Sequence, residues 1–206
     1  MVQAQTKPLT FEEFLEQYPE NGGCYELVEG EVIEVRPIGK HELISGFLSY
    51  QLTDVALQAN LPYRIPKTCV VKPNRPGAGY IPDVVVLDLT YLNTDPLWET
   101  ASTITQGTSA QLVVEVVSTN WRDDYGLKLS DYEALGIPEY WIIDYKALGA
   151  ERNIGSPKQP TLTICTLVNG EYHLNQYRED QSLISTVFPN LELTANMVFN
   201  AGLLPD

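Results

Sequence analysis

Two acidic residues stand where buried strands would otherwise be apolar. Glu115 interrupts the run Gln111–Val117, and Asp83 follows Pro82 and opens the run Val84–Leu87. An ion inside a strand costs several kcal/mol unless a partner compensates it. Two neighbouring carboxylates would also repel each other, by about 4 kcal/mol at about 4 Å and an effective dielectric constant near 20. A divalent cation would remove both penalties, so the pair predicts a metal-dependent hydrolase.

A lysine is the third candidate catalytic group. On a helix from about Asp123 to Leu135, Lys128 falls inside the apolar stripe, between the directions of Tyr132 and Leu135. A buried lysine is unfavourable unless its ammonium reaches a partner, and carboxylates with a bound phosphate would serve. The alternative is that its stem covers apolar surface while its head stays in water. Beside Asp83 and Glu115, we favour the catalytic interpretation.

Other polar residues have structural interpretations that we prefer. Asp123 and Asp124 open the same helix, where acids usually cap the end or offset its dipole. A single histidine at a helix start, such as His41, is more often structural than a ligand. Candidate accessory residues are His41 and two acids of an N-terminal hairpin that could face inward, Glu26 and Glu31.

The hydrophobic pattern predicts the elements that position these residues. The N-terminal part should contain a short helix after the capping box Thr10–Glu13, a hairpin Tyr25–Val35 turning at Glu29-Gly30, and a long helix from His41 to about Asn60. Three strands (Tyr63–Lys72, Ile81–Leu89 and Gln111–Val117) should follow, with an irregular section at 90–109. After them we expect the helix 123–135 ended by Gly136, a strand Glu139–Tyr145, and a hairpin of Thr161–Val168 and Glu171–Tyr177.

This order predicts an α/β protein with a mixed sheet. Consecutive strands with short connections favour antiparallel pairing, and the strand–helix–strand unit favours one parallel pair. The helix, three-strand meander, helix and strand would form one domain over residues 1–206, with added N-terminal and C-terminal β-hairpins. In the third strand, Val113, Glu115 and Val117 should share one face, opposite Leu112, Val114 and Val116.

Composition limits the class of protein and the kind of metal. The chain is 44% hydrophobic and 19% charged, as expected for a globular protein. No apolar stretch approaches the roughly 20 residues that span a bilayer, and the start does not resemble a signal peptide. The three cysteines contain no CxxC pair, so we expect a reducing cytoplasm rather than a zinc site. Oxygen ligands instead favour Mg²⁺ or Mn²⁺.

The charge distribution bears on a nucleic-acid partner. The net charge of −14 argues against such binding, which depends on neutralising phosphates. The segment 36–79, however, holds six basic and two acidic residues and leads into Pro82-Asp83. We take Lys40, Lys72 and Arg75 as candidate nucleic-acid ligands. The alternative is that the density of basic residues is ordinary and only acids are scarce there.

Pro82-Asp83 and Glu115-Val116-Val117, on this order of elements, resemble the PD-(D/E)XK nuclease superfamily. The wider sequence resembles one bacterial branch, the Uma-two family of restriction endonucleases, over nearly the whole chain. The matching stretches are Tyr25–Glu31, His41, Tyr80–Val86, Leu112–Ser118, Asp124, Lys128, Tyr132, Gly136–Asp144 and Ser185–Pro189.

The resemblance implies metal-dependent cleavage of DNA phosphodiesters. Asp83, Glu115 and the main-chain carbonyl of Val116 would hold the metal. The superfamily lysine position is Val117 in this sequence. In this branch the lysine comes from the next helix, which corresponds to Lys128, and it would orient water and offset transition-state charge.

Two other classes of function remain open. The charge of −14 and Val117 favour a non-catalytic binding or assembly module on a nuclease fold. An enzyme acting on RNA, or on branched or damaged DNA, is the other alternative. The exposed strands of the added hairpins also favour a symmetric homodimer.

Overall fold

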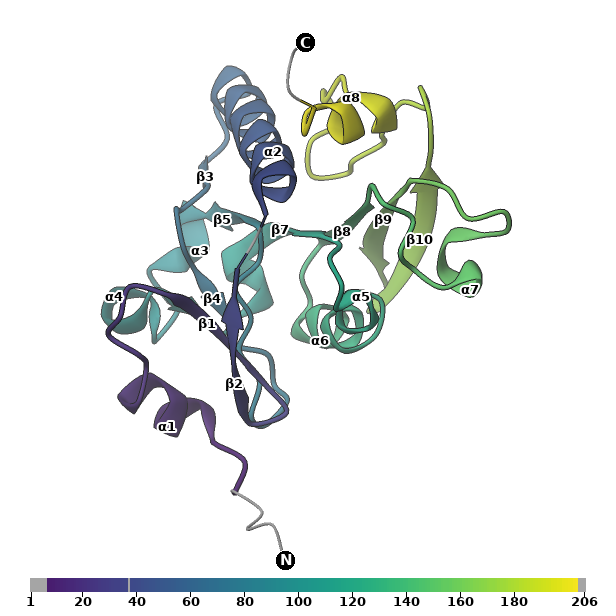
Figure 1. Cartoon of the computed structure of the whole chain (residues 1–206). Helices are drawn as coiled ribbons and strands as arrows, with labels where there is room; N and C mark the ends of the chain where they lie inside the picture. Colours follow the sequence, from purple (N-terminus) through teal and green to yellow (C-terminus); the bar gives the residue numbers. More distant parts are fainter. Residues whose placement is uncertain (1–6, 37, 204–206) are drawn as a thin grey trace, which may run out of the picture.

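A computed structural model of the chain describes residues 7–36 and 38–203 (Figure 1). Six strands form its central sheet: β3 (Tyr63–Arg64), β5 (Val84–Asp88), β7 (Ala110–Val116), β8 (Glu139–Asp144), β9 (Thr161–Val168) and β10 (Glu171–Tyr177). Their order across the sheet is β10-β9-β8-β7-β5-β3. β5 and β7 are antiparallel, whereas β7 and β8 are parallel. The predicted α/β class with a mixed sheet is thereby confirmed.

Helices cover both faces of this sheet. Figure 1 shows α2 (Gly39–Gln58) and α8 (Ala195–Asn200) above the strands, and α5 (Trp121–Asp124) and α6 (Leu127–Leu135) below them. Alternate residues of β7, and Val117 directly after it, enter the two cores. Leu112, Val114 and Val116 pack on the α2 side, and Val113 and Val117 pack on the α6 side. The predicted alternation is confirmed, and it directs Glu115 toward α6.

Local sequence explains why these elements begin and end where they do. In α2 the residues at four-residue spacing are buried: Ile44, Leu48, Leu52 and Ala56. Gly136 ends α6 in the left-handed conformation, with φ 85°. The turn between β9 and β10 is Asn169-Gly170, with φ values of 54° and 88°, which suits a two-residue hairpin. These three predictions are confirmed.

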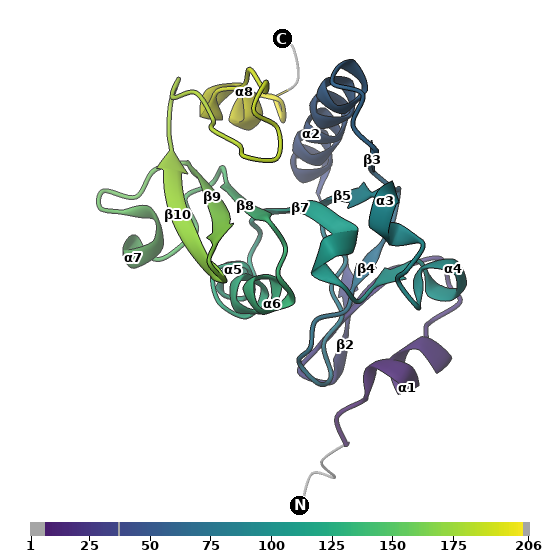
Figure 2. The same cartoon turned by 180° about the vertical axis from the view of Figure 1, so that it is seen from behind.

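The N-terminal part forms a smaller core of its own. It contains α1 (Phe11–Glu16), which has the predicted capping box of Thr10 and Glu13, and the hairpin of β1 (Cys24–Val28) and β2 (Glu31–Val35). Its buried apolar residues are Phe11, Phe14, Tyr25, Leu27 and Val70. Seen from both sides in Figures 1 and 2, α1 lies at the end of the molecule opposite α8.

The strand predicted over Tyr63–Lys72 is wrong as one element. It is divided into β3 and β4 (Val70–Val71), with Pro66 between them, and β4 pairs in parallel with β6 (Thr103–Ile104) in a separate sheet. The section 90–109, predicted as irregular, contains β6, most of α3 (Leu89–Leu92), α4 (Trp98–Ala101) and a 3-10 turn (Gly107–Ser109). A buried carboxylate, Asp95, orders this section by accepting hydrogen bonds from Thr105, Gln106 and Ser109.

The helix predicted over 123–135 is also divided. It consists of α5 and α6, with a break at Tyr125-Gly126. A Cβ at Gly126 would lie 2.8 Å from the carbonyl oxygen of Arg122, so the chain comes very close to itself there. Beyond β8, the chain includes a short helix α7 (Glu151–Ile154). Within residues 7–36 and 38–203, no helix has the length and apolar character needed to cross a membrane.

Candidate active site

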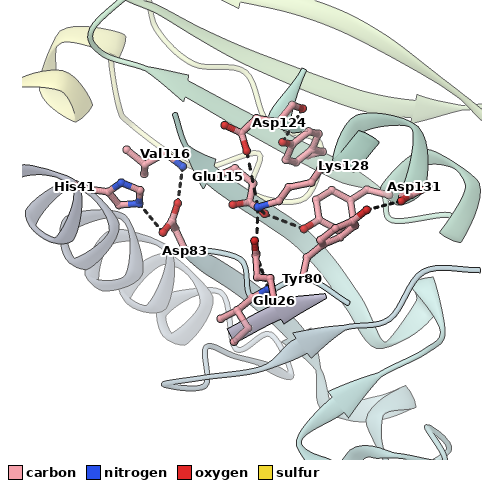
Figure 3. Close-up of polar contacts among 12 residues, drawn as sticks. Glu26, His41, Tyr80, Asp83, Glu115, Val116, Asp124, Lys128 and Asp131 are labelled. Atoms are coloured by element: carbon pink, nitrogen blue, oxygen red, sulfur yellow. Dashed lines mark hydrogen bonds and ion pairs between the residues drawn. The ribbon is translucent and has the colours of Figure 1, made fainter. Parts of the chain in front are cut away.

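Asp83, Glu115 and Lys128 line one cavity of about 450 Å³. Asp83 immediately precedes β5, Glu115 lies near the end of β7, and Lys128 comes from the first turn of α6. The β1–β2 hairpin and the first residues of α2 supply other parts of the wall, including Glu26, Ile33 and His41. Figure 3 shows Glu26, His41, Asp83, Glu115 and Lys128 approaching one another from different segments of the chain.

Lys128 and Glu115 form a buried ion pair. Their Nζ and Oε1 atoms are 3.0 Å apart, and the residues are only 7% and 4% exposed. The hydroxyl of Tyr132 donates a second hydrogen bond to the same Oε1, at 2.8 Å. Burial raises the pKa of Glu115 well above its ordinary value, and the charge of Lys128 only partly opposes this. A buried carboxylate of this kind is favourable only beside positive charge.

Asp83 is held by two donors. Its Oδ1 lies 2.6 Å from Nε2 of His41, and its Oδ2 accepts the main-chain N–H of Val116 at 2.6 Å. His41 therefore contacts the predicted site instead of only starting a helix. Among the described residues, no ion pair within 4.0 Å joins Asp83 to Lys128. The lysine thus reaches one of the two predicted carboxylates directly.

Two further carboxylates surround Lys128. Glu26 Oε1 is 3.2 Å from its Nζ and also accepts the N–H of Ile81, and Asp124 Oδ1 is 3.8 Å away (Figure 3). Burial acts to lower the pKa of Lys128, but Glu115, Glu26 and Asp124 together raise it. Burial raises the pKa of Asp124 to about 7, against the opposing charge of Lys128. One ammonium is therefore shared by three acids.

The capping prediction for Asp124 is wrong. Its side chain is buried and lines the cavity, and in the described chain neither α5 nor α6 has a side-chain hydrogen bond at its N-cap. The four-residue spacing to Lys128 was the available signal, because such residues share a helix face. Asp123 is partly exposed in the first turn of α5, where it suits the helix dipole.

Glu31, the other hairpin acid, is exposed and lies outside the cavity lining. The prediction that it could face inward is therefore wrong. It follows the turn residue Gly30 at the far end of the hairpin, whereas Glu26 pairs with Ile33 near the cavity. The two acids lie on the same face of the hairpin, and their different positions along it decide which one reaches the cavity.

The three basic residues predicted to bind nucleic acid lie in different places. The Lys40 ammonium is 4.8 Å from the ring centre of Tyr145, which lines the cavity. Lys72 and Arg75 line a second hollow of about 600 Å³ beside α1. The guanidinium of Arg75 also pairs with buried Asp131, at 2.8 Å from Nη2 to Oδ1. Lys40 thus contacts the wall of the candidate active site, whereas Arg75 is paired with a carboxylate outside it, and the role of each basic residue stays a prediction.

Comparison with known proteins agrees with the resemblance predicted from the sequence. The Uma2 family model, described as "Putative restriction endonuclease", matches residues 11–196. The crystal structure of a "putative nuclease" from Anabaena variabilis is similar, with a TM-score of 0.70 and 18% identity over 95% of this chain and 100% of that one. At this identity the likeness shows a nuclease-like fold. No curated protein matches the chain. Because the family match spans most of the sequence, this chain belongs to the Uma2 family of restriction endonuclease-like proteins.

Proposed function

We propose that this protein is a Mg²⁺- or Mn²⁺-dependent endonuclease that hydrolyses DNA phosphodiester bonds. The observation that carries the proposal is the buried pair of Lys128 and Glu115, 3.0 Å apart, in a cavity that Asp83 also lines. Family membership supports a nuclease, and the metal and the DNA substrate are our inference from the site.

The oxygen donors of the cavity suit a hard divalent cation. Asp83, Glu115 and the main-chain carbonyl of Val116 would hold it. Among residues 7–36 and 38–203, no three His, Cys, Asp or Glu side chains are placed to share one ion. Mg²⁺ commonly binds through one or two carboxylates and keeps several waters, so the donor set fits. When bound, such an ion supplies positive charge to a phosphoryl oxygen and lowers the pKa of water.

The surrounding residues would position the reacting groups. His41 and the N–H of Val116 fix the two oxygens of Asp83, and Tyr132 fixes Glu115. The ammonium of Lys128 would orient the attacking water and offset the negative charge that develops on the phosphate. Both carboxylates and the lysine are rigidly held, which favours catalysis by positioning.

Substitution of the buried pair tests the activity. Glu115→Gln should abolish metal-dependent DNA cleavage, and Lys128→Ala should reduce it by about 100-fold or more, because each removes a charge from the reacting centre. Nicking of supercoiled DNA with Mg²⁺ or Mn²⁺ measures this. Glu31→Gln and Lys67→Ala change exposed residues of the same types and should leave cleavage intact. Equal cutting by the wild-type protein and both site variants would assign the activity to a contaminant.

A non-catalytic binding or assembly module is the second candidate. It is favoured by Val117, which is buried in the core where the superfamily places its lysine, and by the three carboxylates that already share Lys128. Calorimetric titration with Mn²⁺ separates the two functions. A tight dimer that takes up no Mn²⁺ would favour the module. Cleavage of RNA or of branched DNA in preference to duplex DNA would instead change the substrate class.

We further propose that the chain acts as a single-domain homodimer in the cytoplasm. Cutting both strands of a duplex suits two sites related by a two-fold axis, and β10 forms one edge of the sheet. All three cysteines, Cys24, Cys69 and Cys165, lie in the described part and are free thiols, which suits a reducing compartment. Light scattering on the purified protein gives the number of subunits.

A further inference from the structure

Two lysines converge on one aromatic ring beside the cavity. The ammonium groups of Lys40 and Lys146 lie 4.8 and 5.4 Å from the ring centre of Tyr145. Within the described residues, no carboxylate lies within 4.0 Å of either ammonium. These cations therefore remain outside the network that surrounds Lys128.

The three residues adjoin the candidate active site. Tyr145 and Lys146 line the same cavity as Asp83 and Glu115 and directly follow β8, the parallel neighbour of β7. Lys40 immediately precedes His41, whose ring contacts Asp83. Tyr145 packs in the core on the α2 side of the sheet, whereas Glu115 contacts Lys128 and Tyr132 of α6. Tyr145 and these carboxylates thus line the cavity from the two sides of the sheet, and Lys40 contacts the cavity wall through Tyr145.

Tyr145 and Lys40 are held in place by packing before any ligand binds, whereas Lys146 is exposed. Tyr145 is only 7% exposed, so its ring is held by the surrounding core. The stem of Lys40 packs on Gly202, where an added Cβ would lie 2.5 Å from its Cγ. An anion that approaches both ammonium groups would be stabilised by each of them. The carboxylate-rich remainder of the cavity would repel that anion.

We propose that Lys40, Tyr145 and Lys146 form a phosphate subsite that holds the backbone of a nucleic-acid strand beside the scissile phosphate. This inference rests on the proposed nuclease function and assigns its binding of the strand. It also explains how a chain of net charge −14 accepts a polyanion: the positive charge is local and lies next to the chemistry.

Binding of a labelled oligonucleotide tests the subsite without cleavage. In a Glu115→Gln background with Mg²⁺, Lys40→Gln combined with Lys146→Gln should weaken binding about 10-fold or more, and lower the salt slope of log K by about one to two. Fluorescence anisotropy over a salt series measures both quantities. Lys67→Gln, which changes an exposed lysine away from the cavity, should leave both as in the background protein.

Two variants of the ring separate positioning from folding. Tyr145→Phe keeps the aromatic face and should keep the affinity, whereas Tyr145→Leu keeps an apolar side chain and should weaken binding.

Unchanged affinity and salt slope in the double lysine variant would overturn the subsite alone and would leave the effect of Glu115 on cleavage untouched. Equal affinity for free pyrophosphate and for the oligonucleotide would overturn it as a strand-binding site. If the background protein binds neither single-stranded nor duplex oligonucleotide, the subsite and the proposed function both fall.

Discussion

Lys128 is surrounded by more negative charge than its own positive charge can balance. Its ammonium lies 3.0, 3.2 and 3.8 Å from Glu115, Glu26 and Asp124. The ring of Tyr80 lies 5.6 Å away and supplies a further weak attraction. The fold consequently holds excess carboxylates at the site when no divalent cation is bound, and their protonation should affect stability.

The stability of the metal-free protein should depend on pH through these acids. Burial raises the pKa of Asp124 to about 7 and that of Glu115 well above its ordinary value. The folded chain therefore binds these protons more tightly than the unfolded chain, and their contribution to the free energy of unfolding falls as pH rises from about 4 to about 7. Asp124→Asn should remove the part of this fall in unfolding free energy that comes from Asp124.

Urea denaturation in the presence of a chelator measures the effect. The difference in unfolding free energy between Asp124→Asn and the wild type should change in favour of the variant by at least about 1 kcal/mol as pH rises from about 5 to about 8. A change of this size corresponds to a pKa shift of roughly one unit. A difference in unfolding free energy that stays constant over this range would contradict the prediction.

The sequence predicted the central site residues but not their full set. Asp83, Glu115 and Lys128 could be found because an ion in an apolar strand, or on an apolar helix stripe, is costly and needs a reason. Asp124 was misassigned because an acid at a helix start has a common structural role. The contact of His41 with Asp83 joins residues from two distant segments, and no local pattern reports such a contact.

At the level of elements, the regular parts of the fold were predictable and the irregular parts were not. The alternation in β7, the turn Asn169-Gly170 and the end of α6 at Gly136 follow from local sequence. The short strands β4 and β6 pair with each other, and the segment directly after β6 is fixed by Asp95, a residue that no periodicity marks. Short strands bury too few residues to give a recognisable pattern.

Another buried acid, Glu139, fixes the C-terminal segment to β8. Its carboxylate is fully buried and accepts hydrogen bonds from Trp141, Ser185, Thr186 and Val187. Because Ser185, Thr186 and Val187 belong to one loop, a single carboxylate fixes part of the path from β10 to α8. This contact docks a segment of the chain onto the sheet and lies outside the lining of the candidate active site.

Glu139→Gln should destabilise the fold strongly. The amide nitrogen would face donors, and each unsatisfied buried donor costs about 1–3 kcal/mol, so the free energy of unfolding in urea should fall by at least about 2 kcal/mol. Glu171→Gln, on the exposed start of β10, should change it by less than about 0.5 kcal/mol. Similar denaturation midpoints for the two variants would show that the buried carboxylate contributes little.

For the whole molecule, the main electrostatic feature is a net charge of −14 with a carboxylate-lined cavity. Divalent cations should associate weakly with such a surface and specifically with the cavity. A specific ion present at about 100 times its Kd adds about 2.7 kcal/mol to the free energy of unfolding. That corresponds to several degrees in melting temperature for a domain of this size, at about 2–4 °C per kcal/mol.

Mn²⁺ should therefore raise the melting temperature of the wild-type protein, and Asp83→Asn or Glu115→Gln should remove most of the increase. Differential scanning fluorimetry with and without Mn²⁺ measures it. Glu31→Gln removes the same kind of charge outside the cavity and should keep the increase. An equal increase in all four proteins would show general surface binding and would count against the proposed metal site.

Glu26 joins the β1–β2 hairpin to the interior, because one carboxylate oxygen binds both the N–H of Ile81 and the ammonium of Lys128. Any outward swing of that hairpin, such as admission of a bulky strand could require, must break this contact. Opening the entrance would then free the lysine from one of its three counter-charges at the moment a phosphate arrives. If the proposed function is correct, opening of the hairpin and release of the Lys128 ammonium would thus be coupled.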